Sequence, residues 1–163
     1  MIVISDTTPI ITLMKINELV LLKDLFGRVY IPSDVYSELV IDEKYKVEAE
    51  AIRKAEYIVV EEINSQNVDK LMEETALDRG ESAAICLYEL KVDDKILLID
   101  ERKGREVAKE RNIKIIGTIG LLALSFKKGI RTKDEIISLV EQIRLKRKCY
   151  SWDLLNSLLD IVK

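Results

Sequence analysis

The chain has 163 residues and a net charge of −3, with 48% hydrophobic and 34% charged residues. A chain of this length is expected to form one domain that buries roughly 70% of the surface exposed by the unfolded chain. The weak negative charge excludes a global basic field that attracts nucleic acid, and no apolar run approaches the ~20 residues that a membrane-spanning helix needs.

The N-terminus and the cysteines bear on where the protein works. Residues 2–4 already form an apolar run, without the basic region and cleavage site of a signal peptide. Cys86 and Cys149 stand alone, and neither belongs to a CxxC pair. We therefore expect a cytoplasmic protein with two reduced thiols.

Short runs rich in Ile and Val alternate with helical patterns along the chain. The predicted strands are 2–5, 28–31, 57–61, 95–99 and 113–117. The predicted helices are 9–15, 17–26, 33–40, 47–55, 65–77, 81–91, 102–111, 118–128, 133–148 and 152–162. Because strands that alternate with helices are typical of parallel sheets, this pattern predicts an α/β fold, a three-layer domain with a central parallel sheet of about five strands flanked by helices. We expect residues 1–163 to form this single domain, with a core at 1–128 and a C-terminal helical appendage at 129–163.

Two of the predicted strands end in an aspartate. Asp6 follows the first strand and Asp100 follows the fourth. Ligands of parallel sheets bind beyond the carboxyl ends of the strands, and neighbouring strands lie ~4.8 Å apart, so both carboxylates could contact one ion if their strands are neighbours. The chain has no histidine. Carboxylates without an imidazole predict a hard divalent ion, Mg²⁺ or Mn²⁺, which acidifies a bound water.

Each acidic residue also has a structural explanation. Asp6 could form a turn or cap a helix, and Asp100 could cap the helix that follows it. The segment Asp78-Arg79-Gly80-Glu81 has the form of a capping box. Glu38 alone would be a solvated surface residue. The shared location of the acids at strand ends and helix starts is what favours a metal site.

Four motifs together resemble a PIN-domain nuclease. They are Ser5-Asp6-Thr7-Thr8-Pro9, Pro32-x-x-Val35-x-x-Glu38, Gly80-Glu81-Ser82-Ala83-Ala84-Ile85 and Leu98-Ile99-Asp100-Glu101-Arg102-Lys103-Gly104-Arg105. The resemblance runs from Met1 to about Lys128. It is strongest to the branch of PIN-like proteins related to the toxins of VapBC-type toxin–antitoxin systems, the VapC-type toxins.

This resemblance implies a PIN-like fold and a metal-dependent ribonuclease that cleaves RNA with Mg²⁺ or Mn²⁺. It implies that Asp6, Glu38, Glu81 and Asp100 are the catalytic acids and metal ligands, and that Thr7 supports the metal shell. Many PIN nucleases have aspartate at the third position, where this chain has Glu81. The resemblance also implies a small antitoxin protein as a partner and a homodimer.

Arg102, Lys103 and Arg105 follow the fourth acid. They could bind the phosphates of RNA that flank the cleaved bond, because phosphate contacts position a strand without reading its bases. They could equally form a solvated helix face.

Two other functions fit parts of the sequence. One is a PIN-like protein-interaction module with impaired catalysis. The other is an aspartate-based phosphatase or receiver with Asp6 as the acceptor. A phosphatase of the haloacid-dehalogenase type would carry a second aspartate two residues later, where this chain has Thr8.

Overall fold

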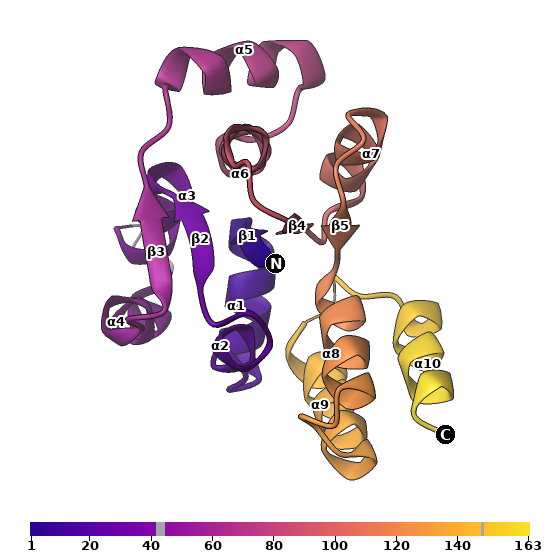
Figure 1. The fold of residues 1–163 in the computed structure, drawn as a ribbon. Helices are drawn as coiled ribbons and strands as arrows, with labels where there is room; N and C mark the ends of the chain where they lie inside the picture. Colours follow the sequence, from indigo (N-terminus) through magenta and orange to yellow (C-terminus); the bar gives the residue numbers. More distant parts are fainter. Residues whose placement is uncertain (42–44, 148) are drawn as a thin grey trace.

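The computed structural model describes residues 1–41, 45–147 and 149–163. Within them, a five-stranded parallel sheet has the order β3-β2-β1-β4-β5 (Figure 1). The strands are β1 (Ile2–Ser5), β2 (Val29–Pro32), β3 (Ile58–Glu61), β4 (Lys95–Leu98) and β5 (Ile115–Ile116). β1 lies at the centre and pairs directly with β4. The predicted α/β fold is confirmed, and the ends of the first and fourth strands are neighbours.

The helices follow the predicted order. They are α1 (Thr7–Lys15), α2 (Leu21–Phe26), α3 (Ser33–Val40), α4 (Lys46–Lys54), α5 (Ser65–Thr75), α6 (Arg79–Leu90), α7 (Arg102–Glu110), α8 (Thr118–Lys127), α9 (Lys133–Lys146) and α10 (Trp152–Ile161). α2 is shorter than the predicted helix 17–26: Asn17 has a positive φ of 56°, which is not helical, and the helix begins at Leu21. α9 ends at Lys146, and residue 148 of the predicted helix 133–148 lies outside the described residues.

Successive residues of the central strands pack into opposite cores. Val3 and Leu98 belong to a core formed with α1, α2, α8, α9 and α10. Ile4 and Leu97 belong to a second core formed with α5, α6 and α7. Figure 1 shows α5, α6 and α7 on one side of the sheet, with α1, α2 and α8 on the other. Strand side chains alternate between the two faces, so a sheet covered on both faces needs apolar residues at nearly every strand position.

The first two turns of α6 are buried from their second residue onward. Every residue from Gly80 to Leu87 is inaccessible or nearly so. The predicted helix 81–91 is apolar nearly all round, which is typical of a buried helix. Its burial places Glu81 in the interior, close to the carboxyl end of β1.

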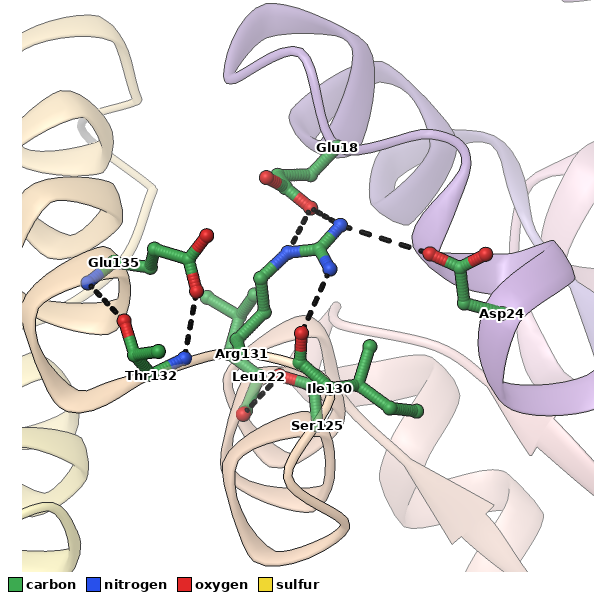
Figure 2. A network of polar contacts seen from close by, with 8 residues as sticks. All are labelled: Glu18, Asp24, Leu122, Ser125, Ile130, Arg131, Thr132 and Glu135. Atoms are coloured by element: carbon green, nitrogen blue, oxygen red, sulfur yellow. Dashed lines mark hydrogen bonds and ion pairs between the residues drawn. The ribbon is translucent and has the colours of Figure 1, made fainter.

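An arginine ties the beginning of the C-terminal appendage to the loop between α1 and α2 (Figure 2). Arg131 donates from Nε and Nη2 to Glu18 Oε2 at 3.0 and 2.7 Å, and its Nη2 lies 3.7 Å from Asp24 Oδ2. Thr132 and Glu135 then form a capping box that starts α9. These contacts fix the direction in which the chain leaves α8.

Candidate active site

Two of the predicted acids meet beside the first turn of α6. Thr7 Oγ1 donates to Glu38 Oε2 at 2.8 Å. A Cβ atom added to Gly80 would lie 3.3 Å from Asp6 Oδ1 and 3.1 Å from Glu38 Oε2. Both carboxylates therefore face the same point, and a glycine at position 80 leaves room for them. The structure brings together Asp6, Glu38 and Thr7, as the sequence predicts.

Asp6 is a buried acid whose side chain does not cap a helix. It stands at the N-cap position of α1, but its side chain makes no capping hydrogen bond. Only 3% of Asp6 is exposed. Burial raises the pKa of Asp6 well above its usual range, and the charges of Asp78, Glu81 and Glu38 raise it further, while the Thr7 backbone N–H offsets part of the rise. A buried carboxylate among other carboxylates attracts a cation.

Glu81 makes the predicted capping box. Its Oε2 accepts from the Asp78 backbone N–H at 3.2 Å, and Asp78 Oδ1 accepts from the Glu81 backbone N–H at 2.8 Å. Its Oε1 faces α7, because a Cβ atom added to Gly104 would lie 2.9 Å from it. Burial, with the nearby charge of Asp78, raises the pKa of Glu81 to about 7. Glu81 therefore has a structural role and also adds negative charge near Asp6.

The raised pKa of Glu81 has a testable consequence for stability. The folded pKa of about 7 lies above the ordinary value of 4.5, so the folded state favours the neutral form. The contribution of Glu81 to the free energy of unfolding is therefore greatest below pH 4.5 and is lost as the pH rises through about 7. Glu81→Gln keeps an acceptor for the Asp78 N–H and has no charge to bury. In urea unfolding with EDTA present, the free energy of unfolding of the variant should fall less between pH 4.5 and about 7 than that of the wild type.

Glu135→Gln is the matched control, because Glu135 occupies the same capping-box position at the start of α9. The Thr132 backbone and hydroxyl lower the pKa of Glu135, so its contribution is lost on acidification instead. Parallel pH profiles for the wild type and Glu81→Gln would contradict the raised pKa.

Asp100 is held by a different set of groups. Its Oδ1 accepts from the Thr118 backbone N–H at 2.7 Å, and its Oδ2 accepts from Thr118 Oγ1 at 2.7 Å. Its Oδ2 also accepts from the Tyr150 hydroxyl at 2.5 Å. Asp100 thus accepts from the first backbone N–H of α8, whose N-cap residue is Gly117. The alternative that Asp100 caps the helix following it is wrong, since the N-cap of α7 is Glu101.

Tyr150 links the C-terminal appendage to this acid. Its hydroxyl lies 2.8 Å from Thr12 Oγ1 in addition to its bond with Asp100. Since its single proton is directed at Asp100, the Thr12 hydroxyl is the donor in the other bond. Burial and the charge of Asp100 raise the pKa of Tyr150. Sequence reasoning missed both residues that hold Asp100. Thr118 could have been found from its place directly after a predicted strand, whereas no local signal marks Tyr150.

The number of carboxylates that lie close together determines whether the site can bind a divalent metal ion. Among the residues that the structure describes, no group of three or more His, Cys, Asp or Glu side chains is close enough together to hold one. Mg²⁺, however, is usually bound by one or two carboxylates, with waters and substrate phosphates completing its shell. Asp6 and Glu38 supply two carboxylates, and neither Asp6 nor Glu81 has an ion-pair partner in the described part of the chain. This oxygen-only donor set fits a hard cation.

A cavity of about 620 Å³ opens next to Asp100. Arg102 and Arg105, two of the three predicted RNA contacts, line it. Arg102 is exposed and pairs with Glu106 at 2.8 Å, whereas Arg105 is half-buried and donates to the Ile99 carbonyl at 2.9 Å. Lys103 lies on another side of α7, where its Nζ donates to the Ala76 carbonyl at 3.3 Å.

A family model described as a PIN domain matches residues 2–163. The match extends past residue 128, where the motif resemblance ends, and includes α9 and α10. No curated protein and no solved structure matches the chain. In the part of the chain that the structure describes, no helix is long and apolar enough to cross a membrane.

Proposed function

This chain belongs to the PIN-domain family, and from that membership we propose that it is a Mg²⁺- or Mn²⁺-dependent endoribonuclease. PIN domains are generally nucleases, and they generally use divalent metal ions. The main support within the structure is the convergence of Asp6 Oδ1 and Glu38 Oε2 on Gly80. The family match favours a nuclease over an aspartate-based phosphatase or receiver.

In the proposed reaction, water attacks an RNA phosphodiester in line with the bond that breaks. Asp6 and Glu38 would hold the ion, with Glu81 and Asp100 as further ligands. When bound, the ion stabilises negative charge on the phosphoryl group and acidifies a water. Thr7 orients Glu38 through its hydrogen bond.

The positions of the basic residues suggest how the strand is held. Arg102 and Arg105 would contact phosphates that flank the cleaved bond, because they line the cavity beside Asp100. We propose the same role for Lys103, acting from another side of α7. Contacts of this kind fix the register of the strand without selecting its sequence.

The direct test is cleavage of a labelled single-stranded RNA by the purified protein. We expect internal cleavage with Mg²⁺ or Mn²⁺ and none with EDTA. Cleavage that persists in EDTA would contradict the metal-dependent mechanism. Absence of cleavage with either ion would favour the alternative, a catalytically impaired PIN-like module that acts through protein contacts.

We further propose that the protein is the toxin of a toxin–antitoxin pair and works in the cytoplasm. A ribonuclease in a cell that contains abundant RNA must be inhibited, and a small antitoxin would inhibit it. An arginine or lysine of such a partner would complement the acids, since charge-assisted bonds to carboxylates are among the strongest hydrogen bonds.

A homodimer is the expected oligomeric state. Large apolar side chains are exposed on the C-terminal helices, among them Leu145 at 81% and Trp152 at 66%. A two-fold interface uses the same patch on both copies and could bury them. Light scattering should give about twice the chain mass of 18.7 kDa. A monomer mass throughout the micromolar range would contradict the dimer and leave the proposed nuclease activity untouched.

A further inference from the structure

The cavity beside Asp100 has the size and composition of a ligand site. Its volume of about 620 Å³ lies within the ~300–1,000 Å³ typical of small-molecule pockets. Ile116, Ile119 and Leu154 give it apolar walls, contributed by β5, α8 and α10. Such walls suit a flat, weakly polar group.

The charged residues of the cavity suit an anion attached to that group. Arg105 uses one of its five N–H donors for the Ile99 carbonyl, and its positive charge lies beside the cavity. Arg102 adds a second guanidinium. Asp100 and Glu101 also line the cavity, so a phosphate would make its contacts with the arginines. A nucleotide combines a base for the apolar walls with a phosphate for the guanidinium groups.

The position of the cavity relates it to the acids. Asp100 forms part of the cavity wall, and β4, which precedes it, pairs with β1, which precedes Asp6. A nucleotide in the cavity would thus lie next to a phosphodiester at the acids. A base can enter a pocket only when it is neither paired nor stacked in a helix, as in single-stranded segments of RNA.

We propose that this cavity binds one unpaired nucleotide of the RNA, adjacent to the bond that is cleaved, with its base between the apolar walls and its phosphate on Arg105 and Arg102. The proposal rests on the nuclease function proposed above and restricts its substrate to RNA that is single-stranded at this position. Double-stranded RNA would be bound and cleaved poorly.

Cys149 provides a reporter inside the cavity. It lines the cavity and is exposed, whereas Cys86 is buried. The full-length protein would be alkylated with iodoacetamide in EDTA, so that no cleavage occurs, and modification of each thiol would be followed by mass spectrometry. A short single-stranded RNA should slow the alkylation of Cys149 several-fold, and the same RNA annealed to its complement should not. Equal rates with and without the single strand, or equal protection by the duplex, would overturn the proposal.

Filling the cavity gives a second test that does not depend on thiol chemistry. Cys149→Trp places a large ring in the cavity, and Cys149→Ala is the matched control, since both remove the thiol at an exposed position. Circular dichroism would verify that both variants are folded. By fluorescence anisotropy in EDTA, Cys149→Trp should bind the single strand roughly tenfold more weakly, the order of effect of losing one base contact. Wild-type affinity in Cys149→Trp would overturn the proposal.

The two proposals can fail separately. Metal-dependent cleavage together with unprotected Cys149 would reject the nucleotide cavity and leave the nuclease function intact. Protection of Cys149 by single-stranded RNA, with no cleavage under Mg²⁺ or Mn²⁺, would support the cavity as an RNA site and reject the nuclease function.

Discussion

Asp6→Asn is expected to abolish metal-dependent RNA cleavage while leaving the fold at least as stable as the wild type. The substitution removes a proposed ligand, so activity should fall by more than roughly 100-fold, since even groups one step beyond a metal's ligands change affinity or activity by ~10–100-fold. The effect on stability has the opposite sign, because the free energy of unfolding should stay the same or rise. Burial raises the pKa of Asp6 above the ordinary 3.8, so the wild type loses stability as the pH rises from 3.8 through the folded pKa. Asparagine has no charge to bury.

Two measurements check this expectation. Cleavage of labelled RNA with Mn²⁺ gives the loss of activity, and urea unfolding in EDTA at neutral pH gives the stability. Asp93→Asn is the matched control, because Asp93 is exposed in the loop before β4. Wild-type cleavage by Asp6→Asn would reject the metal site, and a markedly less stable variant would indicate that Asp6 serves the fold.

Asp100→Asn should lower both activity and stability. Three donors point at the carboxylate of Asp100, two from Thr118 and one from Tyr150. An asparagine side chain has one acceptor oxygen, and its NH₂ group would face at least one of these donors. A buried donor left without an acceptor costs about 1–3 kcal/mol, so the free energy of unfolding should fall by about that amount. Cleavage should be lost as well, because the site loses a proposed ligand.

Tyr150→Phe is the informative companion to this variant. It removes one donor and keeps both the carboxylate and the aromatic ring. If Tyr150 positions Asp100 for metal binding, Mn²⁺ affinity measured by calorimetry should fall by ~10–100-fold. Tyr88→Phe serves as the control, because the Tyr88 hydroxyl accepts from the Lys114 backbone N–H, away from the acids.

For Asp100→Asn, a free energy of unfolding equal to that of the wild type would show that the three hydrogen bonds to Asp100 contribute little to stability.

The sequence predicts those features of the fold that depend on local patterns. Ile- and Val-rich runs mark all five strands, and the spacing of Asp78 and Glu81 marks the start of α6. These features were predictable because periodicity and capping act over a few residues. The start of the second helix was not predicted: Asn17 is left-handed and ends the turn after α1, a position where Asn is common, and α2 begins only at Leu21.

The sequence predicts which residues form the candidate site, but not how their side chains are oriented. Asp6 and Glu38 converge as expected, while Asp100 is held by Thr118 and Tyr150. That partnership depends on the path of the chain through α9, which no local pattern specifies. The three basic residues at the start of α7, Arg102, Lys103 and Arg105, also diverge, because each step along a helix turns a side chain by about 100°, at 3.6 residues per turn. Arg102 and Arg105 consequently line the cavity, and Lys103 does not.

The hydrogen bonds of Tyr150 also set the order in which the site is completed during protein synthesis. The tyrosine is separated from Thr12 by 138 positions and from Asp100 by 50. Domains fold as the ribosome delivers them from the N-terminus, at ~5–20 residues per second. A nascent chain can thus form the whole parallel sheet and begin α8 while Asp100 has only the two donors of Thr118. The third donor arrives only after residue 150 has left the ribosome, so this acid acquires its final environment later than the sheet and Thr118 become available.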